Sequence, residues 1–325
     1  MSKVLVTGAG GFIGSHLVEL LASRGDDVTA LVHYNARNDW GNLELLAPDV
    51  RDAVEVVLGD IRDPHLVAEA VRGREIVYHL AALIGIPYSY LAPHSYVDVN
   101  VGGTLNVLEA ARAHDVHRVV HTSTSETYGT AHYTPIDESH PLQGQSPYSA
   151  SKIGADKMAE SYWRSFDVPV ATLRPFNTYG PRQSLRAVIP TIAAQALSGD
   201  VVRLGSLSPV RDLTYVTDTA RAFVAVAESD ATVGRVFNAG SGSSVSIGEL
   251  ATTILELLGS SAAVVEDPDR VRPAASEVGE LLADTTALRE ATGWEPTVEL
   301  RSGLRPTCDW VAESLGRLKP HLYTV

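Results

Sequence analysis

Short apolar, β-branched runs alternate with amphipathic segments along the first half of the chain. The runs predict six strands, which we place at Val4–Thr7, Val28–Val32, Val54–Leu58, Ile76–Leu80, Val119–Thr122 and Val170–Leu173. Apolar positions at helical spacing predict helices near Ser15–Ser23, Pro64–Val71, Val97–Ala113 and Tyr148–Ser165. This alternation indicates an α/β fold class, in which a doubly wound parallel sheet carries helices on both faces.

The pattern loses its regularity after about Pro175, where Gly, Pro and Ser become frequent between shorter elements. We therefore expect a first domain over residues 1–175 that holds the sheet, and a smaller C-terminal substrate-binding lobe over residues 176–325. Some segments of the lobe are expected to return to the sheet. The chain has no internal repeat and no linker-like tract, so the two parts should pack tightly.

Three glycines at three-residue spacing, Gly8, Gly11 and Gly14, follow the first predicted strand and precede the first predicted helix. Glycine at such places allows a tight turn, a close approach of backbone to a pyrophosphate, and close packing of helix on strand. The N-terminus of the helix adds positive potential for the phosphates. A glycine triplet alone is weak evidence, but its place after the first strand favours a Rossmann-type dinucleotide site over an ordinary turn.

The ends of the following strands indicate what else lines this site, because ligands bind beyond the carboxyl ends of the strands in such a sheet. The residues predicted there are Asp60, Ile61, Leu80, Ala81 and Ala82. The second strand lacks at its end the acidic residue that usually binds the ribose of NAD. Asn35 follows it instead, and Arg37 would suit the 2′-phosphate of NADP. The predicted cofactor is NAD, with NADP left open.

Tyr148 and Lys152 form the only Tyr-x-x-x-Lys in the chain, and their spacing puts both side chains on one helix face. A neighbouring ammonium favours tyrosinate and lowers the pKa of a tyrosine from its usual value of about 10. Tyr148 is then a candidate general base toward a substrate hydroxyl. Because such spacing also occurs in incidental surface pairs, this interpretation depends on the glycine loop.

The fifth predicted strand runs into the segment HTSTSETYG, which brings Ser123, Thr124, Ser125 and Glu126 to the same edge of the sheet. Short hydroxyl side chains there can hydrogen-bond a substrate hydroxyl, and Glu126 is a candidate for moving a carbon-bound proton. The alternative is that the hydroxyls cap a loop and that Glu126 is solvated. The position at a strand end favours chemistry.

Composition excludes several classes of function. The net charge of −13 opposes general binding to nucleic acid or to an anionic membrane. The single cysteine, Cys308, excludes an internal disulfide, and the scattered histidines lack metal-ligand spacing. The chain opens directly on a strand, and no segment approaches the roughly 20 apolar residues of a membrane span. We therefore expect a cytoplasmic protein without a metal.

The chain resembles the extended short-chain dehydrogenase/reductase family, which includes the nucleotide-sugar epimerases and dehydratases. The matching motifs occur in family order over nearly the whole chain, as TGAGGFIG, GDIRD, HLAAL, STSETYG, YSASK, RPFNTYGPR and RDLTYVTD. Within the family, HLAALIGIPYSY, TSTSETYGTAHYTPIDE and PLQGQSPYSASKIGADK look most similar to 4,6-dehydratases that act on nucleotide-linked N-acetylglucosamine in legionaminic-acid-type pathways. The resemblance therefore implies an NAD-dependent lyase whose substrate is a nucleotide-diphosphate sugar such as UDP- or GDP-N-acetylglucosamine.

The resemblance also assigns residues. Tyr148 and Lys152 would be the catalytic pair, and Thr124 would hold the sugar 4-hydroxyl near the tyrosine. Besides the residues already named, the cofactor site would include Phe12, Ile13, Asn35, Asn100, Thr122, Tyr148, Lys152 and Pro175. The substrate would be bound by Ile84, Ser89, Thr124, Asn177, Arg182, Val188, Arg211 and Arg272. The guanidinium groups of the three arginines suit a diphosphate in an acidic protein.

In the implied mechanism, Tyr148 takes the proton of the 4-hydroxyl as hydride leaves C4. Glu126 removes the acidified C5 proton, water leaves from C6, and the hydride returns to C6. One departure is Ser125, which stands where one large branch of dehydratases has an aspartic acid. The alternatives are a decarboxylase or 4-epimerase acting on a UDP-uronic acid, a 5,6-dehydratase, and a cofactor-binding regulator without turnover. A homodimer is expected from the family, through the helices Val97–Ala113 and Tyr148–Ser165.

Overall fold

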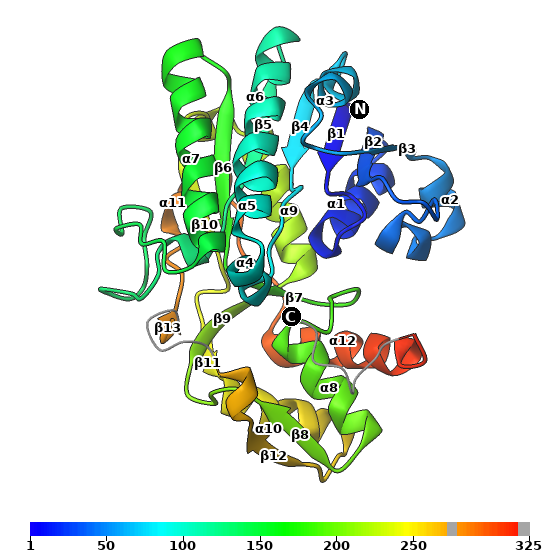
Figure 1. Ribbon diagram of the computed structural model, residues 1–325, viewed down its shortest axis with the longest axis vertical. Helices are drawn as coiled ribbons and strands as arrows, with labels where there is room; N and C mark the ends of the chain where they lie inside the picture. The colour runs from blue at the N-terminus through cyan, green and yellow to red at the C-terminus, as the bar shows by residue number, and fades with distance from the viewer. Residues whose placement is uncertain (272–277, 318–325) are drawn as a thin grey trace.

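A seven-stranded parallel sheet forms the centre of the protein in a computed structural model that describes residues 1–271 and 278–317. The strand order is β10-β6-β5-β4-β1-β2-β3 (Figure 1). Their bounds are β1 Lys3–Thr7, β2 Asp27–His33, β3 Glu55–Gly59, β4 Ile76–His79, β5 Arg118–Thr122, β6 Val170–Pro175 and β10 Val236–Ala239. The predicted doubly wound parallel sheet is thus confirmed, and no end of the six predicted strands differs by more than two residues.

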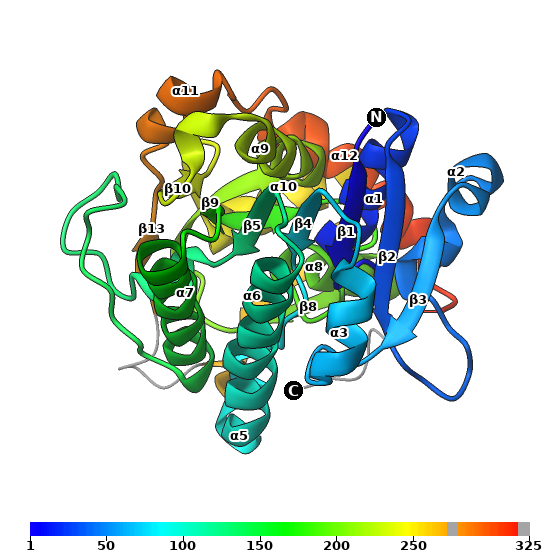
Figure 2. The same ribbon diagram turned by 90° about the horizontal axis from the view of Figure 1, so that it is seen from above.

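Helices cover both faces of this sheet, as the view from above shows (Figure 2). One face carries α3 Pro64–Val71, α6 Gly103–Ala113 and α7 Pro147–Phe166. The other carries α1 Phe12–Ser23, α9 Val216–Glu228 and α11 Thr286–Thr292. Alternate residues of each strand point to opposite faces, so Val4 and Val6 of β1 enter one core while Leu5 enters the other.

Some local elements differ from the sequence prediction. The long helix predicted at Val97–Ala113 begins as a π-helical stretch, Val97–Gly102, and continues as α6. The short helices α4 Ile86–Leu91 and α5 Pro93–Tyr96 precede it, and α2 Pro48–Asp52 precedes β3. The π-helical stretch packs against both α5 and α7, so it brings the loop after β4 close to the helix that carries Tyr148.

The lower part of the molecule in Figure 1 is built on smaller sheets. In the larger of these, β9 lies between β11 and β13 and also pairs with β7. The smaller sheet consists of β8 and β12. The strands are β7 Asn177–Tyr179, β8 Val201–Leu204, β9 Val210–Tyr215, β11 Ser244–Ser246, β12 Ala263–Glu266 and β13 Glu280–Leu281. Helices α8 Val188–Ser198, α10 Ile247–Leu258 and α12 Leu300–Ser314 pack with them around a separate apolar core.

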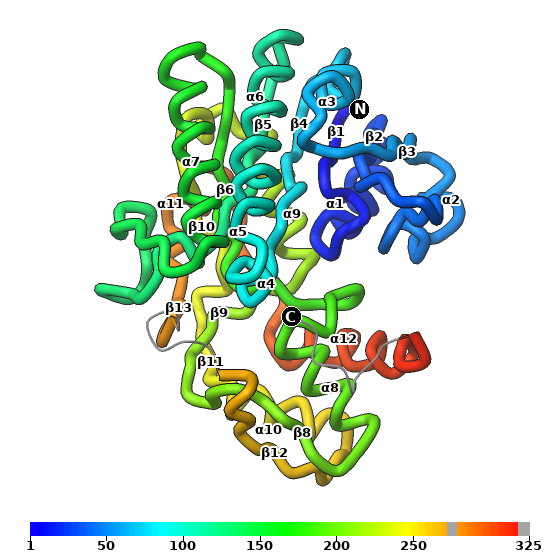
Figure 3. Tube along the Cα trace, viewed as in Figure 1, coloured from blue at the N-terminus to red at the C-terminus, as the bar shows by residue number. Residues whose placement is uncertain are grey.

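The chain passes between the two parts several times after residue 175, as the trace in Figure 3 shows. It enters the lower part at β7, returns to the main sheet through α9 and β10, descends again through β11 and α10, and returns once more at α11. Two buried carboxylates hold these crossings. Asp212 accepts hydrogen bonds from the backbone N–H groups of Ser241, Gly242 and Ala283. Asp218 accepts bonds from the N–H groups of the segment that leads into α12.

No helix among the described residues is long and apolar enough to cross a membrane.

Candidate active site

The glycine loop joins β1 to α1, and each of its three glycines has a different surrounding. Gly8 has φ +69, and a Cβ there would lie 2.8 Å from the backbone nitrogen of Ala81. A Cβ on Gly14 would lie 2.3 Å from the carbonyl oxygen of Gly8, so the helix and the loop are in close contact. Gly11 is the N-cap residue of α1, and a Cβ there would meet only the Gly8 carbonyl oxygen, at 3.1 Å. Packing therefore constrains Gly8 and Gly14 more strongly than Gly11. Phe12 and Ile13 form the first turn of α1.

The loop after β2 is organised by Asn35 rather than left open. The Asn35 amide oxygen accepts hydrogen bonds from the N–H groups of Arg37 and Asp39, and its nitrogen donates to the Asp39 carbonyl at 2.7 Å. The loop then returns to the glycines, because the Asn42 N–H donates to the Gly10 carbonyl. The backbone of Asn35 therefore lies where the sequence predicts, while its side chain is engaged within the loop.

Of the predicted residues at the ends of β3 and β4, Leu80 and Ala81 lie against the glycine loop, because a Cβ on Gly8 would meet their backbone. The Asp60 carboxylate is bound by the Arg62 side chain, whose hydrogen bond is the largest cause of a pKa lowered to about 2. After β4, the N–H groups of Leu80 and Ala81 donate to the Thr7 hydroxyl, which ties this strand end to β1. Ile61 is buried, and Ala82 is half-buried.

Helix α7 carries Tyr148 in its first turn and Lys152 one turn later. A capping box between Ser146 and Ser149, with Pro147 in the first turn, fixes where the helix begins. Tyr148 is 7% exposed, and burial raises the pKa of its hydroxyl, against which a hydrogen bond with Thr124 acts. The tyrosine is therefore protonated until a positive charge offsets its burial.

Lys152 is 3% exposed and donates from Nζ to the carbonyl oxygen of Thr122, at 2.6 Å. Burial lowers the pKa of this ammonium to about 8, and the negative charge of Asp156 acts against the lowering. The Thr122 hydroxyl is buried without a hydrogen-bond partner, and Pro175 ends the adjacent strand β6. The structure thus brings the predicted pair to the ends of β5 and β6.

The segment after β5 forms a short 3-10 helix, Ser125–Thr127, capped by Thr124. The Thr124 hydroxyl accepts a hydrogen bond from the Glu126 N–H at 3.2 Å, while Ser125 is buried. The charge of Glu126 is among the causes that raise the pKa of Tyr148, which places the carboxylate within electrostatic reach of the tyrosine. The sequence prediction that these side chains lie together at one strand edge agrees with this arrangement.

Three further predicted residues, Asn100, Ser89 and Ile84, lie on the segment between β4 and α6. Asn100 joins the loop after β4 to α7, since its amide exchanges hydrogen bonds with the backbone of Leu83 and donates to the Ser151 hydroxyl at 2.9 Å. The Ser89 hydroxyl is buried and donates to the Ile86 carbonyl at 2.6 Å, whereas Ile84 is 68% exposed.

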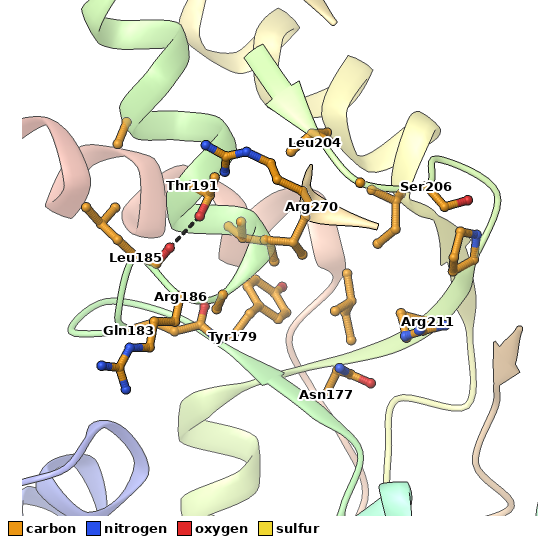
Figure 4. Close-up of a pocket in the computed structure, with 18 of the residues that line it drawn as sticks. Asn177, Tyr179, Gln183, Leu185, Arg186, Thr191, Leu204, Ser206, Arg211 and Arg270 are labelled. Carbon is orange, nitrogen blue, oxygen red and sulfur yellow. Dashed lines mark hydrogen bonds between the residues drawn. The ribbon is translucent and has the colours of Figure 1, made fainter. Parts of the chain in front are cut away.

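A cavity of about 310 Å³ lies between α8, β9 and the loop after β7 (Figure 4). Three predicted substrate residues line it, namely Asn177, Val188 and Arg211. It approaches Tyr148 of the predicted pair, because Pro87 lines the cavity while its neighbour Ile86 packs with Tyr148 in one apolar cluster. The site therefore consists of a strand-end edge that carries the Tyr–Lys pair and a cavity that opens beside it.

Gln183 and Arg270 also line the cavity, and the sequence interpretation missed them. The Gln183 amide donates to the Thr178 carbonyl, while its oxygen is buried without a hydrogen-bond partner, as is that of Asn177. The signal for Gln183 was its position directly after the RPFNTYGPR motif.

Arg182 has a different surrounding from the one its motif suggested. It is absent from the cavity lining, and its guanidinium donates to Glu19 of α1 at 2.6 Å. The carbonyl of the preceding Pro181 contacts His16 of α1 at 3.0 Å, so this loop is bound to the helix of the glycine loop. Arg272 lies outside the described residues. Among the described residues, no group of three or more His, Cys, Asp or Glu side chains is arranged to hold a metal ion.

Comparison with known proteins assigns the family. The model for GDP-mannose 4,6 dehydratase matches residues 5–307. The chain belongs to this family. It is 35% identical to the low-salt glycan biosynthesis protein Agl12 of Haloferax volcanii, over 94% of this chain and 97% of that protein. The resemblance to extended short-chain dehydrogenase/reductase enzymes is thereby confirmed, and so is the prediction of an enzyme.

Two solved structures share the fold of this dehydratase-family member over nearly its full length. DesIV of Streptomyces venezuelae, a dTDP-glucose 4,6-dehydratase with NAD bound, is 32% identical, with TM-score 0.88 and coverage of 98% of this chain and 99% of that one. The UDP-N-acetylglucosamine 4-epimerase of Methanobrevibacter ruminantium M1 is 29% identical, with TM-score 0.87 and coverage of 96% and 99%. Dehydratases and 4-epimerases thus share this architecture.

The contrast between Gly11 and Gly14 gives a test of the cofactor site. Gly11→Ala is expected to lower the melting temperature only slightly, because its Cβ would meet a single protein atom, the Gly8 oxygen at 3.1 Å, but it should weaken NAD binding by about tenfold or more, because the Cβ faces the predicted pyrophosphate position. Gly14→Ala, whose Cβ would overlap the Gly8 carbonyl, should lower both stability and binding. Calorimetric titration with NAD and thermal melting measure both effects. Equal NAD affinity in Gly11→Ala and the unmodified protein would contradict this assignment.

Proposed function

We propose that the protein is a nucleotide-sugar 4,6-dehydratase whose substrate is UDP- or GDP-N-acetylglucosamine. The observation that carries this proposal is a carboxylate, Glu126, which follows β5 within electrostatic reach of Tyr148. Oxidation at C4 needs only the tyrosine and lysine. Elimination of water also needs a base for the C5 proton, and Glu126 supplies one.

NAD is the cofactor that the site fits. Gly11 is the N-cap residue at the N-terminus of α1, where backbone N–H groups and the helix dipole favour a pyrophosphate. NAD, when bound, supplies the nicotinamide that accepts a hydride from C4 of the sugar and returns it to C6. The residues that would hold it are the glycine loop, the ends of β3, β4 and β5, and Lys152.

The Tyr148 hydroxyl takes the proton of the sugar 4-hydroxyl in the first step. Because burial raises the pKa of Tyr148, this transfer requires nearby positive charge, which the Lys152 ammonium provides from the same helix face. The Thr124 hydroxyl lies within hydrogen-bond reach of Tyr148 and orients the substrate oxygen toward it. The 4-keto group then acidifies C5, and Glu126 removes that proton as water leaves from C6.

The cavity supplies what a nucleotide diphosphate requires. Arg211 is 7% exposed and lines the cavity with Asn177 on the paired strand. Helix α8 begins at Val188 without a side-chain cap, so its first N–H groups are available to phosphate oxygens. In Figure 4, Arg270 approaches the same cavity from the other side. These groups place local positive potential in a protein whose net charge is −13.

A 4-epimerase is the second candidate, because the family and the solved relatives include both activities. Simple 4-epimerization needs no base for C5, so Glu126 favours dehydration. A decarboxylase of UDP-glucuronate shares the same Thr-Ser-Glu motif and is distinguished by loss of the C6 carbon. A 5,6-dehydratase would stop before the final reduction. Ser125 differs from the aspartic acid of one dehydratase branch, so protonation of the leaving hydroxyl falls to Glu126 or to water.

The product of the reaction decides among these candidates. Purified protein incubated with UDP-N-acetylglucosamine or GDP-N-acetylglucosamine is expected to give a product lighter by one water, and mass spectrometry measures this. In heavy water the product should carry one deuterium at C5. Loss of carbon dioxide from UDP-glucuronate, with the N-acetylglucosamine nucleotides unchanged, would overturn the proposal. A product of unchanged mass with inverted C4 would establish the epimerase.

Glu126→Gln separates oxidation from elimination. The variant should still oxidise C4, so the absorbance of reduced nicotinamide rises on addition of substrate. Formation of the dehydrated product should fall about 100- to 10,000-fold, because a general base is lost. Glu290→Gln, an exposed position on α11, is the matched control and should behave as the unmodified protein. Unchanged dehydration by Glu126→Gln would exclude this glutamate as the base.

We also propose that the protein is a cytoplasmic homodimer. The helices α6 and α7 pack side by side on one face of the sheet, and large apolar side chains remain exposed nearby, with Leu91 72% and Val97 55% exposed. Such side chains near one face favour association with a second copy. Analytical ultracentrifugation is expected to give twice the chain mass of 34.7 kDa, and a single-chain mass at micromolar concentration would contradict the dimer.

A further inference from the structure

Asp156 is a buried carboxylate one helical turn after Lys152 that the proposed reaction does not yet use. It is 5% exposed, and its side-chain hydrogen-bond partners come from other elements. Its Oδ2 accepts hydrogen bonds from the Ser123 hydroxyl at 2.8 Å and from Nη2 of Arg174 at 2.9 Å. Its Oδ1 lies 3.1 Å from Nε2 of His121.

These contacts join α7 to the ends of β5 and β6 at the level of the catalytic pair. Ser123 stands between two residues that act on that pair. Thr122 accepts the hydrogen bond from Lys152, and Thr124 hydrogen-bonds Tyr148. Asp156 therefore holds Ser123, which lies between the residue that contacts Lys152 and the residue that contacts Tyr148.

We propose that Asp156 is a positioning residue for the dehydration, which fixes the Thr122–Thr124 segment against α7 and keeps Lys152 in its ammonium form. This inference rests on the proposed role of Tyr148 and Lys152. Lys152 and Asp156 are four residues apart on one helix, a spacing at which an ammonium and a carboxylate attract each other.

The charge balance around Lys152 shows why a carboxylate is needed. The titratable and charged groups that face it or its neighbours are His79 of β4, His121 of β5, Arg174 of β6, Glu126 after β5, and Tyr148 and Asp156 of α7. Burial lowers the pKa of both histidines, so they are neutral at pH 7. The buried cations are then Lys152 and Arg174, and Asp156 is the buried anion that contacts Arg174 directly.

Asp156 is ionised in this setting. Burial alone would raise the pKa of its carboxyl, but the hydrogen bond with His121 and the charge of Arg174 outweigh burial and lower the pKa to about 2. Replacing Asp156 by asparagine leaves two buried cations without an anion, and this disfavours the ammonium of Lys152, whose pKa is already lowered to about 8. Replacing Arg174 by glutamine removes a cation, and this favours the ammonium.

The direct test titrates Lys152 in protein labelled with ¹⁵N at lysine. The chain has only four lysines, so the Nζ signal of Lys152 can be assigned by its disappearance in Lys152→Arg. Asp156→Asn is expected to lower the Lys152 pKa by roughly one unit or more, the size of effect of one neighbouring opposite charge. Arg174→Gln is expected to raise it. Asp218→Asn, a buried carboxylate held by backbone N–H groups far along the chain, is the matched control and should leave it unchanged.

This titration needs no substrate, so its result is independent of the proposed function. An unshifted Lys152 pKa in folded Asp156→Asn, verified by thermal melting, would overturn the inference. If Asp156→Asn does not fold, Arg174→Gln decides, and absence of an upward shift there would overturn it equally. A Lys152 pKa that shifts as expected while no nucleotide sugar is converted would support the inference and remove the proposed function.

The pH dependence of kcat provides a second test of the same charge effects. The ammonium is present below the Lys152 pKa and lost as pH rises through it, so in Asp156→Asn the alkaline decline of kcat should begin at lower pH by the amount measured in the titration. Tyr148 is also relieved of one negative charge, and the acidic limb should move slightly in the same direction. Loss of kcat of about tenfold or more with an unchanged KM is expected from misplacement of the reacting groups. Asp156→Glu, which keeps the charge, should restore the alkaline limb.

Discussion

The parallel direction of all seven strands in the main sheet is the constraint on which this site depends. Parallel strands end at one edge, and in a doubly wound sheet the ligand crevice lies beyond that edge. Segments distant in sequence, at Gly8, Asp60, Ala81, Thr124 and Pro175, are therefore gathered at one edge of the sheet. Few further interactions are then needed to bring the site residues together, because their positions at the strand ends already place them close to one another.

Proximity alone does not provide the protonation states that the proposed reaction needs, because burial favours the neutral form of both Tyr148 and Lys152. Burial raises the pKa of the Tyr148 hydroxyl and lowers that of the Lys152 ammonium, so each is driven toward its neutral form. The Asp156 carboxylate and the carbonyl of Thr122 favour the ammonium of Lys152, and Arg174 pairs with Asp156. An isolated buried charge is costly, but a hydrogen-bonded buried pair keeps the local field fixed before substrate arrives.

The sequence predicted the sheet well because its strands are short apolar runs of regular spacing, and their ends differ little from prediction. The strand β10 escaped prediction, since four residues far beyond the main pattern join the sheet only through pairing with β6. Within the site, Tyr148 and Lys152 were visible because they share one helix. The contact of Arg182 with Glu19 was not visible in the sequence, because it joins residues 163 positions apart. No local pattern indicates which part of the molecule a guanidinium group will contact. For the same reason the three partners of Asp156, which come from two strands, required the structure.

The repeated crossing of the chain between the two parts has a consequence for how such an enzyme can change its substrate. Neither part corresponds to one continuous stretch of the gene, because α9, β10 and α11 return to the main sheet while β11, α10 and α12 build the lower part. Exchange of a gene segment between two relatives would therefore cut through both parts and through the carboxylates that hold the crossings. New specificity in this architecture must arise by substitutions around the cavity and by changes in loop length, while the whole framework is inherited as one unit.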